Sequence, residues 1–144
     1  MGQYHVLVNF DKREFVHPRH IGCGLKLCEQ VGGGNSTSTA LAMLVAACSG
    51  RFGSQPGAGG DFSIGKPVVG RWAGDRVAYV GDFGGEGDIA SMPTLDCGEV
   101  YRACGEPGSG WSDISQIVRL AMEAEQEWRE SRLLPCGPAD GLAD

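Results

Sequence analysis

The stretch Glu29–Gly50, EQVGGGNSTSTALAMLVAACSG, decides the fold that we predict. Its glycines and hydroxyl residues lead into an apolar run that predicts a helix over about 37–48. Asn35, Ser36 or Thr37 is a suitable N-cap, because such side chains accept hydrogen bonds from the free amides of a first helical turn. The run from Ala40 to Cys48 is apolar on every side. A helix of this kind is expected to be buried on most sides, at the centre of the core.

Strand patterns lie on both sides of this segment. YHVLVNF alternates, a polar turn follows, and Pro18 ends a short return strand, so residues 4–17 are predicted to form a β-hairpin. Residues 68–72 and 76–83 indicate two further strands, with Val77, Tyr79 and Phe83 on one face. Residues 98–104 are a candidate fifth strand.

The clearest helix is predicted over about 113–131, capped by Ser112 or Asp113. Ile114, Val118, Ala121 and the residues at helical spacing around them form an apolar stripe. A shorter helix is predicted over 21–31. These elements predict a single α+β domain over 1–132, with an antiparallel sheet of four or five strands, a buried central helix at 37–48 and an amphipathic C-terminal helix. Residues 133–144 are expected to form a flexible tail.

Charge divides the 144-residue chain into two parts. The net charge is −6, with +3 over residues 1–80 and −9 over residues 81–144. An acidic chain is a poor general binder of nucleic acid, because neutralisation of phosphate drives such binding. The acidic part is expected either to meet a basic partner surface or to be a solvated face that aids solubility.

Localisation is predicted to be cytoplasmic. The sequence begins with no signal-peptide pattern, and its longest apolar run is too short to cross a membrane. We therefore expect no membrane partner. The six cysteines are expected to be mostly free thiols.

The first candidate site is the predicted helix start, formed by Gly33, Gly34, Asn35, Ser36 and Thr37. Free amides at a helix start can hold an anionic small molecule or a nucleotide phosphate. The lysine of an ATPase-type phosphate loop is absent here. The alternative interpretation is a capped helix joined to its neighbour by a flexible link.

Two further patterns contain metal-ligating residue types. His17, His20 and Cys23 have imidazole and thiolate groups, the ligand types of zinc, at spacings that are compatible with a zinc site. The run GDFGGEGD places three carboxylates, those of residues 82, 86 and 88, on a glycine loop of the kind that holds Ca²⁺ or Mg²⁺. Exposed loop residues explain both patterns as well. The sequence has neither a nucleophile elbow nor a cysteine-protease signature, so we assign no catalytic residue and expect no cofactor.

Three segments, MGQYHVLVNFDKREF, GLKLCEQ and GRWAGDRVAYVGD, resemble a family of small uncharacterised proteins of bacteria, phages and mobile elements. The resemblance implies no reaction and assigns no functional residue. It does imply a setting in which small acidic proteins often bind and inhibit host defence proteins, as anti-CRISPR proteins do.

The leading expectation is therefore a non-enzymatic binding protein that occludes a host protein. Its predicted partner surface contains Glu123, Glu127 and Glu130, on the outer face of the C-terminal helix. A small-molecule binder at the helix start is the second hypothesis, and a metal-dependent enzyme is the third.

Overall fold

The predicted hairpin forms and lies at the centre of the sheet. The computed structural model describes residues 3–32, 36–47 and 68–132, with the backbone alone over 125–132. β1 (His5–Asn9) and β2 (Glu14–Val16) pair antiparallel. The tight turn between them holds Arg13 at a φ of 52°, a left-handed conformation that normally favours glycine.

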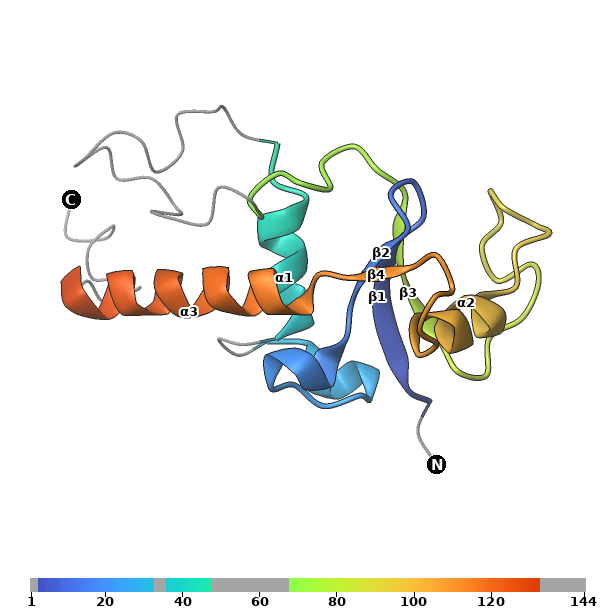
Figure 1. The fold of residues 1–144 in the computed structure, drawn as a ribbon, viewed down its shortest axis with the longest axis horizontal. Coiled ribbons are helices and arrows are strands. Elements are labelled where there is room, and N and C mark those ends of the chain that lie inside the picture. Colours follow the sequence, from blue (N-terminus) through green and yellow to red (C-terminus); the bar gives the residue numbers. More distant parts are fainter. Residues whose placement is uncertain (1–2, 33–35, 48–67, 133–144) are drawn as a thin grey trace, which may run out of the picture.

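Two more strands complete the sheet in the order β3-β1-β2-β4 (Figure 1). β3 (Val77–Gly81) pairs antiparallel with β1, as predicted. β4 (Ser112–Asp113) pairs parallel with β2, so the sheet is mixed and the expectation of a wholly antiparallel sheet was wrong on this point. β4 leads from a helix on one face of the sheet to a helix on the other. The helices are α1 (Thr37–Leu44), α2 (Cys97–Cys104) and α3 (Ser115–Arg132).

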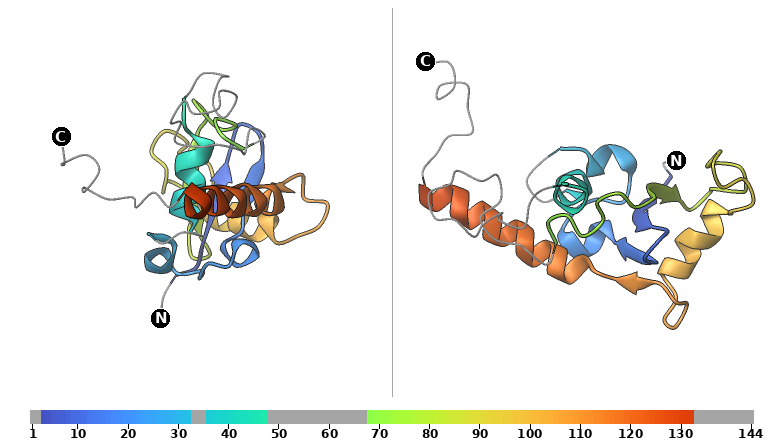
Figure 2. Two further views of the ribbon diagram at one scale, coloured as in Figure 1. Left: turned by 90° about the vertical axis from the view of Figure 1, so that its left-hand side faces the viewer. Right: turned by 90° about the horizontal axis from the view of Figure 1, so that it is seen from above.

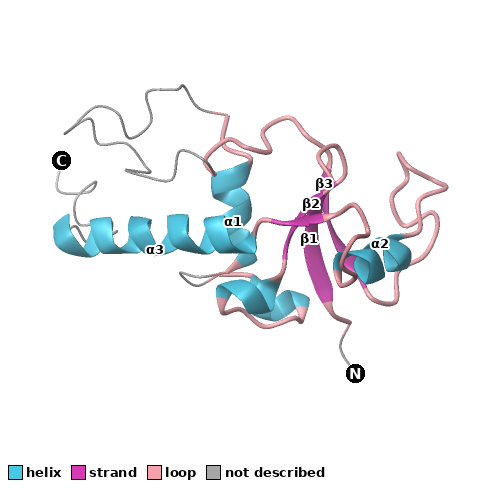
Figure 3. Cartoon of the chain, viewed as in Figure 1, coloured by secondary structure: helices cyan, strands magenta, loops and turns pink. Residues whose placement is uncertain are grey.

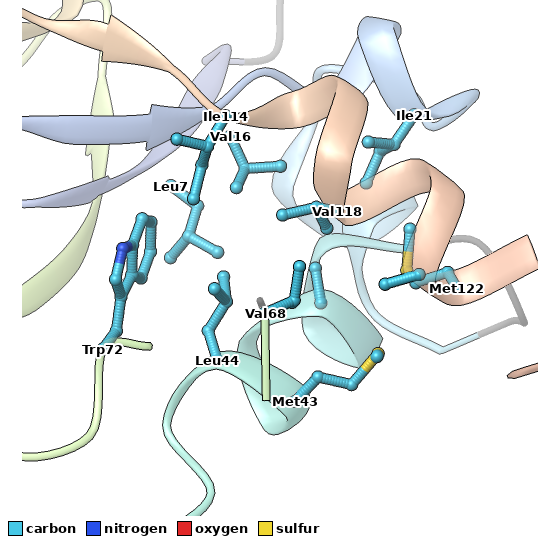
Figure 4. Packing of buried hydrophobic residues seen from close by; sticks show 12 residues of the cluster. Leu7, Val16, Ile21, Met43, Leu44, Val68, Trp72, Ile114, Val118 and Met122 are labelled. Carbon is cyan, nitrogen blue, oxygen red and sulfur yellow. The ribbon is translucent and has the colours of Figure 1, made fainter. Parts of the chain in front are cut away.

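Each face of the sheet is covered by its own hydrophobic cluster, and the fold is a single α+β domain, as predicted (Figure 3). Leu7 faces the cluster that α1 and α3 complete, which Figure 4 shows together with Trp72. Val6 and Val8 face the other cluster, which α2 completes. Because both faces are buried, the three central residues of β1 are apolar without interruption.

α1 is shorter than the predicted helix over 37–48. Ser36 caps it by accepting a hydrogen bond from the Thr39 amide at 3.2 Å. Met43 and Leu44 are buried, whereas Ala42 is exposed, so the helix is buried along one face rather than on most sides. It ends at Leu44 because the chain over 68–72 returns to its C-terminal end, where the amides of two residues bond the carbonyls of Met43 and Leu44.

α3 matches the prediction for residues 113–131 closely, but Ser112 and Asp113, the predicted caps, form β4, and Asp113 Oδ1 accepts from the Ser115 amide at 2.8 Å. Its buried side comprises Val118, Ala121 and Met122, which follow Ile114 at helical spacing. Ile117 was predicted on the same stripe and is 38% exposed. Figure 2 shows α3 running past α1 and away from the sheet, so its N-terminal half makes the contacts with the core.

Three other elements differ from the prediction. Residues 98–104 lie in helix α2 rather than in a fifth strand, and residues 68–72 form successive turns rather than a strand. The predicted helix over 21–31 is replaced by two 3₁₀ helices, η1 (Pro18–Ile21) and η2 (Leu27–Gln30), because Gly22 takes a left-handed φ of 84° between them. The predicted tail over 133–144 lies outside the described residues.

Candidate functional site

The predicted site at the helix start is placed only in part. Gly33, Gly34 and Asn35 lie outside the described residues. The Thr37 hydroxyl is buried, and it joins a short chain of side-chain hydrogen bonds. It donates to Gln30 Oε1 at 2.8 Å and accepts from the Tyr79 hydroxyl at 3.2 Å. Ser36, also buried, caps α1. These bonds give both hydroxyls a role in the fold, and ligand binding here stays a prediction.

The structure brings His17 and His20 together and gives Cys23 a different partner. The two imidazole rings stack with centroids 4.5 Å apart. His20 Nδ1 lies 2.7 Å from Asp113 Oδ2, while the Cys23 thiol donates to the Glu29 carbonyl oxygen at 3.3 Å. Burial, together with the neighbouring His20, lowers the pKa of His17. Over the described ranges, no three His, Cys, Asp or Glu side chains are grouped so that they could hold a metal ion.

The predicted partner surface on α3 is also described in part. Glu123 is exposed and lies 3.6 Å from Arg119, one helical turn earlier. The side chains of Glu127 and Glu130 lie outside the described part of the structure. An exposed pair of this kind contributes little to stability, so the contact leaves Glu123 accessible to a partner.

A surface that the sequence did not indicate lies where β1 begins and β3 ends. Tyr4 and Asp82 pair across the two strands: the Tyr4 amide donates to Asp82 Oδ1, and the Asp82 amide to the Tyr4 carbonyl oxygen, both at 3.0 Å. Phe83 follows directly and is 72% exposed, and Tyr4 is 40% exposed. Tyr101 of α2 lies close by, and its pKa is raised by burial and then by Asp82 and Tyr4. We call Tyr4, Asp82, Phe83 and Tyr101 the Phe83 surface.

The first turn of α2 packs against this surface through two glycines. Gly84, directly after Phe83, donates its amide to the Gly81 carbonyl oxygen at 3.0 Å and so turns the chain at the end of β3. A side chain on Gly98 would overlap the Gly84 carbonyl, because the two backbones touch. The backbone of Phe83 therefore lies in a hydrogen-bonded turn between the sheet and α2.

The carboxylates of the predicted cation loop have other roles in the structure. Asp82 bonds the Tyr4 amide, and Asp88 Oδ2 accepts from the Gly85 amide at 2.9 Å. Glu86 is exposed, and its backbone forms an isolated bridge with Asp96. Asp96 caps α2 by accepting from the Glu99 amide at 3.1 Å. Carboxylates next to the N-terminus of a helix are favoured by its dipole.

Comparison with known proteins assigns no function to this arrangement. Neither a family model, nor a curated protein, nor a solved structure matches the chain. Within the residues that the structure describes, every helix is too short or too polar to cross a lipid bilayer. The resemblance to phage and mobile-element proteins stays a prediction.

Proposed function

We propose that this chain is a non-enzymatic binding protein that occludes a partner protein, and that it docks through the Phe83 surface. The observation that supports this proposal is the 72% exposure of Phe83, beside a Tyr4 that is 40% exposed. Phenylalanine and tyrosine are enriched at protein interfaces, where they dominate the binding free energy.

Phe83 leaves most of its side-chain area exposed to water. Full burial of a phenylalanine side chain is worth about 1.5–3 kcal/mol, and most of that gain is unrealised at Phe83. A partner that covers the ring would recover about 1–2 kcal/mol. Because the backbone of Phe83 lies in the turn that the Gly84 amide closes onto the Gly81 carbonyl oxygen, little backbone ordering entropy would be lost on binding.

The resemblance to phage and mobile-element proteins suggests what the partner is. We propose a host protein, such as a component of host defence, whose working surface is covered when the chain binds. The net charge of −6 favours a protein over nucleic acid as the target. Occlusion requires no catalytic group, in keeping with the absence of a catalytic motif in the sequence.

Affinity capture with matched variants tests the proposal. The immobilised chain and its Phe83→Ala variant are compared for the proteins that they retain from a bacterial lysate, with Val31→Ala as the control. Val31 is 70% exposed, so both substitutions remove an exposed apolar side chain without disturbing the core. We expect Phe83→Ala to reduce capture of the specific partner about tenfold, and Val31→Ala to leave it unchanged. Equal capture by all three proteins would contradict the proposal.

The same assay tests the α3 surface predicted from the sequence. Leu120 is 51% exposed on α3, near Glu123. If Leu120→Ala and Glu123→Lys abolish capture while Phe83→Ala does not, docking occurs through α3 and the Phe83 surface is wrong.

A further inference from the structure

We infer that the partner surface that covers Phe83 is basic, with its cationic groups facing the N-terminal end of α2. This inference depends on the proposed docking through the Phe83 surface, and it specifies the chemistry of the partner. An exposed aromatic ring beside uncompensated carboxylates is complementary to an apolar pocket rimmed by lysine or arginine.

The segment that contains Phe83 has charge of one sign, and the basic residues near the Phe83 surface, Lys26 beside Tyr4 and Arg19 whose charge acts on Tyr101, come from another part of the chain. From residue 77 to residue 101 the sequence contains five carboxylates and neither lysine, arginine nor histidine. The nearest basic residues along the chain are Arg76 and Arg102. Arg76 is occupied by Asp11, to whose Oδ1 it donates from Nη2 at 2.7 Å. The acidic carboxylates of this segment are Asp82, Glu86, Asp88, Asp96 and Glu99.

These carboxylates fall into two groups, those that accept backbone hydrogen bonds and those that do not. Three aspartates, at 82, 88 and 96, accept backbone hydrogen bonds that hold the strand pairing, the loop and the helix cap. Glu86 and Glu99 are exposed, and in the described part of the chain neither side chain forms a hydrogen bond or an ion pair. Neither charge is therefore paired within the described part of the chain, so both are available to a partner, although the helix dipole also favours Glu99 in the first turn of α2.

The two sides of Phe83 differ, which orients the partner. Asp96 caps α2 and Glu99 lies in its first turn, against which the Gly84 turn packs. On the other side of Tyr4 the chain carries Lys26, whose backbone bridges Tyr4. Basic groups of the partner are therefore expected over α2, and its neutral or acidic groups over Lys26.

Selection from a random peptide library tests the inference. Peptides are selected on the full chain and counter-selected on its Phe83→Ala variant, so that those retained need Phe83. We expect the retained peptides to combine an apolar residue with an excess of lysine and arginine. If no peptide survives counter-selection, the proposed docking through Phe83 fails. If the surviving peptides are neutral or acidic, docking stands and only the basic partner is wrong.

Charge variants then test the retained peptides quantitatively. Fluorescence anisotropy compares the chain with Glu86→Gln/Glu99→Gln and with the control Glu106→Gln, which neutralises an exposed glutamate beyond the C-terminal end of α2. We expect the double variant to bind about threefold to tenfold more weakly at low salt and to lose most of the salt dependence, with the control within about twofold of the unmodified chain. Equal affinity and equal salt dependence in all three proteins would overturn the inference.

Discussion

Replacing Trp72 with phenylalanine should test how residues 68–74 are fixed to the sheet. Trp72 is fully buried, and its indole Nε1 donates to Glu14 Oε1 at 2.9 Å. Arg71 binds the same carboxylate, with its Nε 3.0 Å from Oε1. Glu14 belongs to β2, so two consecutive side chains attach residues 68–74 to the sheet.

The expected loss of stability in Trp72→Phe follows from the contacts that the substitution removes. A hydrogen bond to a charged acceptor contributes about 1.5–3 kcal/mol, and the smaller ring leaves a void that costs about 1 kcal/mol. Arg71 still compensates the charge of Glu14 in the variant. The total loss in the free energy of unfolding is therefore expected near the low end of the summed contributions, at about 2–3 kcal/mol. For a chain of this length we expect the melting temperature to fall by about 7–10 °C.

Urea unfolding followed by far-ultraviolet circular dichroism measures the loss of stability, and a double-mutant cycle with Glu14→Ala, which removes the acceptor, isolates the coupling between the two side chains. We expect a coupling free energy of about 1 kcal/mol between the two positions. Trp111→Phe is the control, because Trp111 is half-buried and makes an edge contact with Phe10 at 6.3 Å. A loss below about 0.5 kcal/mol for Trp72→Phe, or strict additivity in the cycle, would refute the reasoning.

The same network predicts a pH dependence. The Arg71 guanidinium lowers the pKa of Glu14 below its usual value of 4.5, and the Trp72 indole adds to this effect against the opposing influence of burial. A carboxylate with a lowered folded pKa stabilises the fold above its unfolded pKa, and the contribution is lost as the pH falls through the folded pKa. Glu14→Gln should therefore flatten the loss of stability below about pH 4.5.

Three further predictions concern the backbone and the histidine pair. Gly98→Ala should destabilise the fold by about 1–3 kcal/mol, measured by urea unfolding, because the new methyl group would meet backbone. Gly105→Ala, where the methyl group would make an ordinary contact, should be close to neutral. Because the pKa of His17 is lowered in the folded chain, the unfolded chain takes up a proton at this histidine at a higher pH than the folded chain does. The melting temperature should therefore fall as the pH drops below about 6.5, and it should fall less in His17→Gln. Arg13→Gly should raise the melting temperature by about 2 °C, because it relieves a left-handed residue.

The elements that could be predicted are those with local signals. The hairpin over residues 4–17 has alternation, a polar turn and a terminating proline, and α3 has a cap and a long apolar period. Patterns of this kind act between residues that are near in sequence, so they survive in the folded chain. The start of α1 at Thr37 was predicted for the same reason, from the Ser36 cap.

Two elements could not be predicted because distant residues decide them. Residues 68–72 have a strand-like composition, but the amides of Gly70 and Trp72 bond the carbonyls of Met43 and Leu44, which are left free at the end of α1. Residues 98–104 have β-branched and aromatic residues, yet they form α2. A capping signal, Asp96 with an acidic residue three positions later, was available in the sequence, but the close approach of Gly98 to Gly84 was not.

The position of Phe83 shows why the candidate site escaped prediction. Strand alternation places it on the same buried face as Val77 and Tyr79, and on that basis it belongs to the core. β3 ends at Gly81, however, and the Gly84 amide folds back onto the Gly81 carbonyl, which moves Phe83 out of the strand pattern and into water. Gly84, which closes this turn, lies against Cys97 and Gly98 of α2, more than ten positions later in the sequence. This hydrogen-bonded turn exposes an apolar side chain that strand alternation would have buried, and this exposure is the physical reason for placing the partner at Phe83.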